Sequence, residues 1–249
     1  MATSATAPWW ARPTMLSLDG PAFVLLARAA LGRAWPAHLA DTILLMALVW
    51  AGYVTDRWMD ARYDDDSRTW RHDASRRHAP LILGLAVLVG LLAALTGAQL
   101  AALWSGVLSW GGLWLLLGVG AIFCGRWLRL GWFVRALCVA GLMAAFVGWG
   151  EAWSRMSLAC VAVLAFANLA AIRRAERPQE RGMGWLLGLA TGTALIFALS
   201  RPDALTLTVA AATGLLGMLG AGSGQHAERR RAIIDAVTFL ALGAAALVA

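Results

Sequence analysis

PLILGLAVLVGLLAAL, the stretch at residues 80–95, contains no charged side chain, and LWLLLGVGAIFC follows at residues 113–124. Both runs are continuously apolar, without the polar alternation of a half-buried strand. Only helices and closed barrels satisfy their backbone groups inside a bilayer, and about 20 apolar residues are needed to cross it as a helix. The two runs therefore predict membrane-spanning helices.

The composition of the whole chain leads to the same interpretation. Charged residues make up 14% of the chain and hydrophobic residues 60%, whereas soluble domains carry about a quarter and about half, respectively. Nothing polar is available to cover so many apolar side chains, so we expect them to face lipid or one another. The fold class is predicted to be all-α, a polytopic transmembrane bundle.

Polar breaks divide the chain into nine predicted membrane segments. Residues 1–14 are polar, contain Pro8 and Pro13, and lack a basic segment leading into the apolar core of an export signal, so the tail is set at residues 1–18. We expect them to form a cytoplasmic tail, followed by a single transmembrane domain at 19–249. The first segment is short and carries Arg28 and Arg33, so a partly interfacial position is an alternative for it. The segments are 19–34, 37–57, 79–97, 100–123, 128–149, 153–172, 183–200, 203–221 and 232–248.

The basic residues are unevenly distributed between the two predicted sides. Cytoplasmic loops carry an excess of arginine and lysine, so this asymmetry predicts a cytoplasmic N-terminus and explains the basic charge without nucleic-acid binding. A chain without lysine that is rich in alanine, glycine and arginine also suggests a bacterial inner-membrane protein. Arginines of the even-numbered connections are Arg57, Arg62, Arg68, Arg71, Arg76, Arg77, Arg126, Arg129, Arg173, Arg174, Arg177, Arg181, Arg229, Arg230 and Arg231. The opposite loops hold little beyond Arg33, Arg155 and Arg201.

An acidic pair, Asp56 and Asp60, follows the second predicted segment. Their four-residue spacing places both carboxylates on one helix face, one turn apart. Two carboxylates there repel each other unless a cation lies between them, and Mg²⁺ prefers hard oxygen ligands. A helix end that simply enters the aqueous phase is an equally valid interpretation of this pair alone.

A second acidic pair, Glu176 and Glu180, follows the sixth predicted segment after Asn168. The topology places it on the same side as Asp56 and Asp60. If the helix continues, the two glutamates share a face, but Pro178 favours a kinked or non-helical segment. The sequence thus predicts two acidic pairs facing one compartment.

These two stretches resemble the motifs of the UbiA-type intramembrane aromatic prenyltransferases. Members of that family have nine transmembrane helices and two aspartate-rich motifs on cytosolic loops after helices two and six. Residues 56–60, DRWMD, are similar to the end of the first motif, and residues 176–180, ERPQE, stand in the place of the second. The pattern around Tyr53, Asp56 and Asp60 is most similar to a divergent bacterial branch of UbiA-like membrane proteins.

The resemblance implies a Mg²⁺-dependent transfer of a prenyl group from a polyprenyl diphosphate to an unknown acceptor. Asp56, Asp60, Glu176 and Glu180 would hold the Mg²⁺ and support catalysis. The isoprenoid tail would lie along the apolar bundle, and Asp235 would pair with an arginine or line the same cavity. The residues expected to bind the substrate are Tyr53, Arg57, Arg68, Arg71, Arg76, Arg77, Asn168 and Arg177.

Several positions depart from the family pattern. Gly52 and Tyr53 replace an asparagine and an aspartate, the second pair is Glu rather than Asp, and no lysine is present to contact phosphate. Two alternatives therefore stay open: a non-catalytic UbiA-like protein that binds an isoprenoid lipid or a membrane partner, and a transporter.

Overall fold

The computed structural model describes residues 18–32, 39–63, 131–148, 155–177, 182–221 and 227–248, with 80, 84–85, 87–89 and 179–180. For residues 39–41, 55–63, 221 and 227–228 it describes the backbone and not the side chains. The predicted segment at 79–97 therefore lies mainly, and the segment at 100–123 wholly, outside the described residues. So does the tail up to residue 17.

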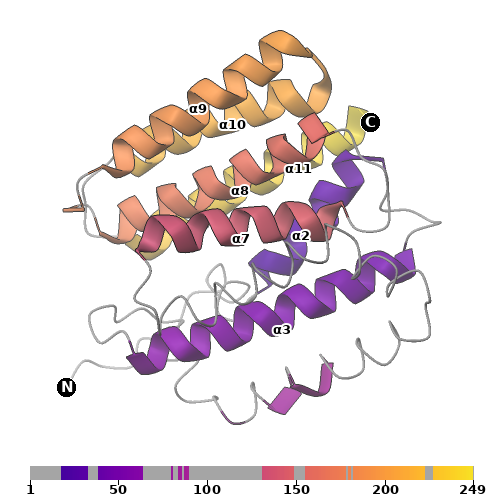
Figure 1. The fold of residues 1–249 in the computed structure, drawn as a ribbon, viewed down its shortest axis with the longest axis vertical. Coiled ribbons are helices and arrows are strands. Elements are labelled where there is room, and N and C mark those ends of the chain that lie inside the picture. The colour runs from indigo at the N-terminus through magenta and orange to yellow at the C-terminus, as the bar shows by residue number, and fades with distance from the viewer. Residues whose placement is uncertain are drawn as a thin grey trace.

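The described part of the chain is helical, and no strand occurs in it. Figure 1 shows α9 and α10 on one side of the bundle and α3 on the opposite side, with α7, α8 and α11 between them. These helices correspond to seven of the nine predicted segments, so the all-α class is confirmed for the described residues. The nine-helix count stays a prediction. The helices are α2 (Asp19–Ala30), α3 (Leu39–Tyr63), α7 (Trp132–Val147), α8 (Arg155–Glu176), α9 (Met183–Ser200), α10 (Ala204–Ala221) and α11 (Ala227–Val248).

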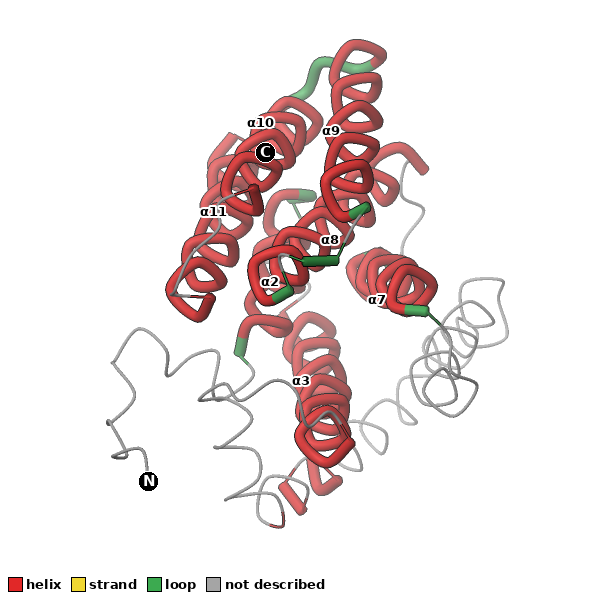
Figure 2. The backbone as a smooth tube through the Cα atoms, turned by 90° about the vertical axis from the view of Figure 1, so that its left-hand side faces the viewer, coloured by secondary structure: helices red, strands yellow, loops and turns green. Residues whose placement is uncertain are grey.

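Helix α8 lies at the centre of the described bundle (Figure 2) and contacts α7, α9, α10 and α11. Its packed positions include Ala167, Ala170 and Ala171, which have no exposed surface. Alanine allows neighbouring helix backbones to approach closely, as is typical of helix interfaces in membranes. The side chains that α8 turns inward therefore have a fixed position between four helices.

Three described helices have the length and composition needed to cross a membrane: α8, α9 and residues 229–248 of α11. The outer surface of the bundle is also apolar. On α9, Trp185 is 82% exposed and Leu199 84% exposed. Large exposed apolar surfaces mark contact with lipid or with another protein. The chain therefore has the helices of a membrane protein, as its composition predicts.

Helices α2 and α3 form an antiparallel pair. Near the end of α2, Arg28 Nε donates a 3.0 Å hydrogen bond to Thr42 Oγ1 near the start of α3. At the other end, a Cβ on Gly20 would lie 2.9 Å from the ring of Tyr53. Helix α3 therefore continues past Tyr53 toward the end of the bundle at which α2 begins.

Helix α2 is too short to cross a bilayer. Its 12 residues span about 18 Å at 1.5 Å per residue, whereas a hydrocarbon core is about 30 Å thick. It ends at Ala30 because Gly32 adopts a left-handed conformation with φ of +73°, a frequent helix stop. It is nevertheless buried, with Val24 and Ala27 at 0% exposure. This first predicted segment is therefore too short to span the membrane alone, but its apolar face packs inside the bundle.

The turn between α9 and α10 is fixed by Asp203. Its Oδ1 accepts a 2.9 Å hydrogen bond from the backbone N–H of Thr206, and its own N–H donates to Thr206 Oγ1 at 3.1 Å. This reciprocal arrangement satisfies two otherwise unused donors at the start of α10. Asp203 thus defines the end of the bundle opposite to the one at which α8 ends and α9 begins.

Candidate functional site

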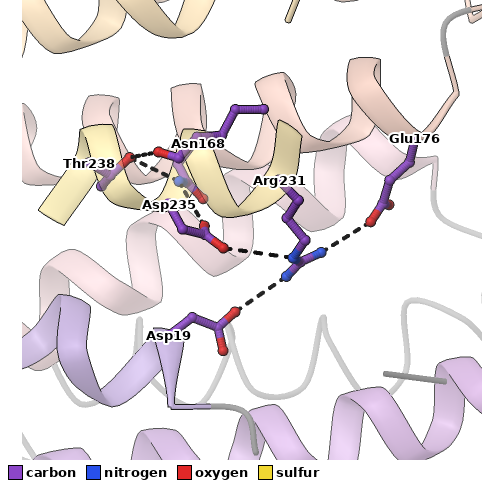
Figure 3. A network of polar contacts seen from close by, with 7 residues as sticks. Asp19, Asn168, Glu176, Arg231, Asp235 and Thr238 are labelled. Carbon is purple, nitrogen blue, oxygen red and sulfur yellow. Dashed lines mark hydrogen bonds and ion pairs between the residues drawn. The ribbon is translucent and has the colours of Figure 1, made fainter. Parts of the chain in front are cut away.

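Arg231 lies at the centre of a buried polar network where α2 and α11 begin and α8 ends (Figure 3). Its Nη1 donates to Glu176 Oε1 at 3.1 Å, and its Nη2 donates to Asp19 Oδ2 at 3.3 Å. Its Nε is 3.8 Å from Asp235 Oδ2, an ion pair without a hydrogen bond. The side chains of Asp19, Arg231 and Asp235 are at most 9% exposed, and that of Glu176 is 22% exposed. One guanidinium thus joins carboxylates from three helices.

Local sequence explains why these groups meet. Arg231 and Asp235 are four residues apart on α11 and so share one face. Asp19 is the first residue of α2, where the helix dipole favours a negative charge. Glu176 is the last residue of α8, and helices generally end before the residue that precedes a proline, here Pro178. Each carboxylate is therefore located by the end or the face of its own helix.

A second polar layer lies deeper in the bundle, next to Asp235. Asn168 Nδ2 donates to Asp235 Oδ1 at 3.2 Å and to Thr238 Oγ1 at 2.9 Å. The Thr238 hydroxyl in turn donates to the carbonyl oxygen of Ile234 at 3.1 Å. Thr238 is 1% exposed and Asp235 6% exposed. Polar groups buried this deeply are commonly functional in membrane helices.

A small, partly open pocket borders both layers. Its cavity volume is about 20 Å³, which is enough for about one water-sized group. Carboxylate, amide, hydroxyl and phenol groups line its polar part, and its remaining walls are apolar. The lining residues are Asp19, Phe23, Tyr53, Val139, Met143, Ala165, Asn168, Leu169, Asp235, Thr238 and Phe239.

The structure separates the two glutamates of the predicted second pair. Helix α8 ends at Glu176, so Glu180 lies beyond the helix, which is the non-helical alternative suggested by Pro178. Glu180 Oε2 accepts a 2.8 Å hydrogen bond from Arg173 Nε, and its Oε1 is bonded to the same guanidinium. The side chain of Arg177 lies 3.6 Å from Glu180 Oε1. Glu176 belongs to the Arg231 network, whereas Glu180 is held by arginines of its own segment.

Two of the predicted substrate-binding residues, Tyr53 and Asn168, line the same pocket. They come from α3 and α8, which are far apart in the sequence. Asp235 also lines this pocket and pairs with Arg231, so its expected pairing with an arginine is confirmed, whereas a shared substrate cavity stays a prediction. The pocket thus joins residues from the two motif-bearing helices.

The first acidic pair lies on the backbone of α3, and its side chains are outside the described residues. Asp56 and Asp60 follow Tyr53 by three and seven positions, or about 4.5 and 10.5 Å along the helix axis. Because α3 runs toward the start of α2, their backbone lies at the end of the bundle that carries Asp19. The predicted phosphate-binding side chains that lie outside the described residues are those of Arg57, Arg68, Arg71, Arg76 and Arg77.

Three residues of the site were not singled out from the sequence: Asp19, Arg231 and Thr238. Arg231 was counted among the arginines that set the topology. Its four-residue spacing from Asp235 on a mainly apolar helix was the available signal. Asp19 lies 212 positions from Arg231, and no local pattern relates the two.

The carboxylate oxygens at this end of the bundle are of the chemical kind that Mg²⁺ prefers as ligands. Among the residues whose side chains are described, no group of three histidine, cysteine or acidic side chains is arranged to hold a metal ion. Of the three acids in the Arg231 network, Glu176 fits the role of a metal ligand best, because its side chain is the most exposed. Glu180 fits less well, since Arg173 binds both of its oxygens.

Comparisons with protein-family models, with curated proteins and with solved structures give no match to this chain. The UbiA-like interpretation therefore rests on the resemblance of its sequence motifs and stays a prediction.

Proposed function

We propose that this chain is a UbiA-like, nine-helix protein of the bacterial inner membrane that transfers a prenyl group from a polyprenyl diphosphate to an acceptor with the help of Mg²⁺. One observation carries this proposal. Tyr53 of α3, Asn168 of α8 and Asp235 of α11 line one pocket, which Arg231 links to Glu176 through Asp235, at the end of the bundle toward which the backbone of Asp56 and Asp60 extends. This shared pocket supports the proposal that the two motif-bearing helices serve a common site.

The distribution of arginines supports a cytoplasmic location for this end. The last turn of α8 carries Arg173 and Arg174, and the start of α11 carries Arg229, Arg230 and Arg231. At the opposite end, the described arginines include Arg155 and Arg201. The positive-inside rule places the arginine-rich end in the cytoplasm, where water-soluble metal ions and diphosphates are available.

The residues of the chain would divide the work as follows. Asp56, Asp60 and Glu176 would hold Mg²⁺, which neutralises the negative charge that develops on the diphosphate. Arg231 would orient Glu176, and Arg177 would contact phosphate oxygens, which match the guanidinium geometry. The phosphate contacts of Arg57, Arg68, Arg71, Arg76 and Arg77 are also part of the proposal.

During transfer, the allylic C–O bond breaks and its electron pair stays on the diphosphate. The acceptor forms the new bond to the allylic carbon and loses a proton to a base. Closely packed apolar helices such as α8 would keep water away from the bound prenyl group. The reactive group would thereby be protected from hydrolysis.

Binding of farnesyl diphosphate to the full chain in lipid nanodiscs tests this function, with and without Mg²⁺. We expect Mg²⁺-dependent binding that Asp60→Asn weakens at least tenfold, because the variant keeps the shape of the side chain and removes one charge. Asp203→Asn is the matched control. Asparagine also caps helices well, and position 203 lies at the opposite end of the bundle. Equal binding by wild type and Asp60→Asn, with no effect of Mg²⁺, would rule the proposal out.

A non-catalytic protein that binds an isoprenoid lipid is the second candidate. The double hydrogen bond between Arg173 and Glu180 favours it, because this acid is already neutralised by a neighbouring arginine. This candidate predicts that the chain binds farnesyl diphosphate but releases no diphosphate with any acceptor that is added. Release of diphosphate that depends on both Mg²⁺ and an added acceptor would exclude it.

A further inference from the structure

Two polar side chains of the pocket, Asn168 and Thr238, already use their hydrogen-bond donors; the phenol of Tyr53, which also borders the pocket, can donate or accept. Asn168 donates one amide hydrogen to Asp235 and one to Thr238. The Thr238 hydroxyl has a single hydrogen, which it donates to Ile234. An amide and a hydroxyl have no further donors to offer. What these two side chains can still present to a ligand is acceptor oxygen.

The orientation of the Asn168 amide follows from its neighbour Asp235. If the amide were turned round, its carbonyl oxygen would face a carboxylate oxygen, and two acceptors would repel each other. The amide nitrogen therefore faces Asp235, and the carbonyl oxygen faces away from it. No hydrogen bond among the described residues uses the Asn168 carbonyl oxygen, so it is available to a donor in the pocket.

The charges around the pocket act in the same direction. Asp19 and Asp235 contribute carboxylates to its lining. Arg231, which pairs with both carboxylates at 3.3 and 3.8 Å, is not among the lining residues. At a buried site an anion near two carboxylates is strongly disfavoured, whereas a cation or a neutral donor is favoured.

The size and walls of the pocket limit what can enter. A cavity volume of about 20 Å³ admits one small group, such as a hydroxyl or an amino group. Phe23, Met143 and Phe239 form part of its apolar wall. A ligand must therefore present a small donor head on an apolar body.

From these observations we propose that the pocket binds the head group of the acceptor, and that this head is an alcohol or an amine and not a carboxylate. That the ligand is the acceptor of a prenyl group rests on the proposed function. The preference for an alcohol or an amine is argued from the lining of the pocket. It extends the proposed function by naming the chemistry that the acceptor must carry.

The test uses three small probes with similar short alkyl bodies and different head groups: 1-propanol, propylammonium and propionate. Their binding to the full chain in nanodiscs is measured by ligand-detected NMR, and empty nanodiscs correct for partition into lipid. We expect propanol and propylammonium to bind at least tenfold more tightly than propionate. Propionate binding as tightly as the other two would overturn the inference.

Two variants test whether the preference arises in this pocket. Asp235→Asn should reduce the preference for propylammonium over propionate at least fivefold, because it removes a lining charge. Thr238→Val leaves one Asn168 donor without its partner, so it should lower the preference at least threefold even if the first variant does not fold. Thr213→Val is the control, since this buried threonine bonds only to Ala210 within α10 among the described residues. An unchanged preference in Thr238→Val would contradict the assignment.

The failure of this inference can be told apart from the failure of the proposed function. If farnesyl diphosphate binds with Mg²⁺ but the probes show no preference, the acceptor class is wrong and the proposed function stands. If the preference is present but farnesyl diphosphate does not bind, the ligand class of the pocket stands and prenyl transfer is refuted.

Discussion

Replacing Arg231 by methionine should strongly destabilise the protein. The guanidinium lies 3.1 Å from Glu176, 3.3 Å from Asp19 and 3.8 Å from Asp235. Two of these carboxylates are less than 10% exposed, so water cannot replace the lost partner. Removing one member of a buried ion pair costs about 3–5 kcal/mol. We expect Arg231→Met to lower the free energy of unfolding by about that amount.

Unfolding in mixed micelles, followed by circular dichroism, measures this change. Arg201→Met is the matched control, because Arg201 pairs with Asp203 at 3.0 Å but is 54% exposed. An exposed pair contributes about 0–1 kcal/mol. Asp19→Asn in the Arg231→Met background should restore part of the loss, since it removes one of the carboxylates left without the guanidinium. If Arg231→Met cost no more than Arg201→Met, the network would not be a buried ionic centre.

Three further changes test other parts of the structure. Gly20→Ala should lower the stability by about 1–3 kcal/mol, because its Cβ would lie 2.9 Å from the Tyr53 ring; thermal unfolding measures this. Asp203→Ala should lower stability by about 1 kcal/mol through loss of the α10 cap, again by unfolding. Glu180→Gln should weaken Mg²⁺-dependent farnesyl diphosphate binding less than Asp60→Asn does, because Glu180 is bonded to an arginine.

Each of these changes has a control or a contradicting result. Gly188→Ala adds the same methyl group on α9 where nothing lies within 4 Å, so it should not lower stability. Asp203→Asn keeps the cap and should remain near the wild-type stability. A Glu180→Gln variant that loses as much binding as Asp60→Asn would show that Glu180 is a direct part of the metal site.

The helices could be located from the sequence wherever polar residues interrupt the apolar runs. Helix α9 was predicted at 183–200 and is found at Met183–Ser200, because Gly182 precedes it and Pro202 follows it closely. Helix α11 begins at Ala227, five positions before the predicted start at 232. A prediction from hydropathy leaves the charged residues 227–231, AERRR, out of the membrane segment. Alanine, glutamate and arginine are nevertheless strong helix formers, so the helix includes them. For the same reason α3 continues beyond residue 57, to Tyr63.

The site was harder to predict than the helices. Asn168 and Tyr53 could be selected because each lies beside a recognisable acidic motif. The partnership of Glu176 with Arg231 joins positions that are 55 residues apart, and that of Asp19 with Arg231 joins positions 212 apart. Such contacts depend on how helices pack, which hydrophobic periodicity in one sequence does not specify. The asymmetry of arginines predicts a functional site at this end of the bundle, but it does not indicate which arginine turns inward.

The placement of the Arg231 network argues that it exists for a purpose other than stability. Apolar residues of similar size often stabilise a protein as well as a buried ion pair does, or better, and the surrounding α8 face shows that this bundle packs well with alanine. Ionisable groups inside membrane domains are costly and commonly functional. Here two members of the network, Asp19 and Asp235, also line the pocket. Arg231 pairs with Asp19 and Asp235 of the pocket and with Glu176, a predicted metal ligand, so in the proposed mechanism one buried guanidinium would orient groups of both halves of the site.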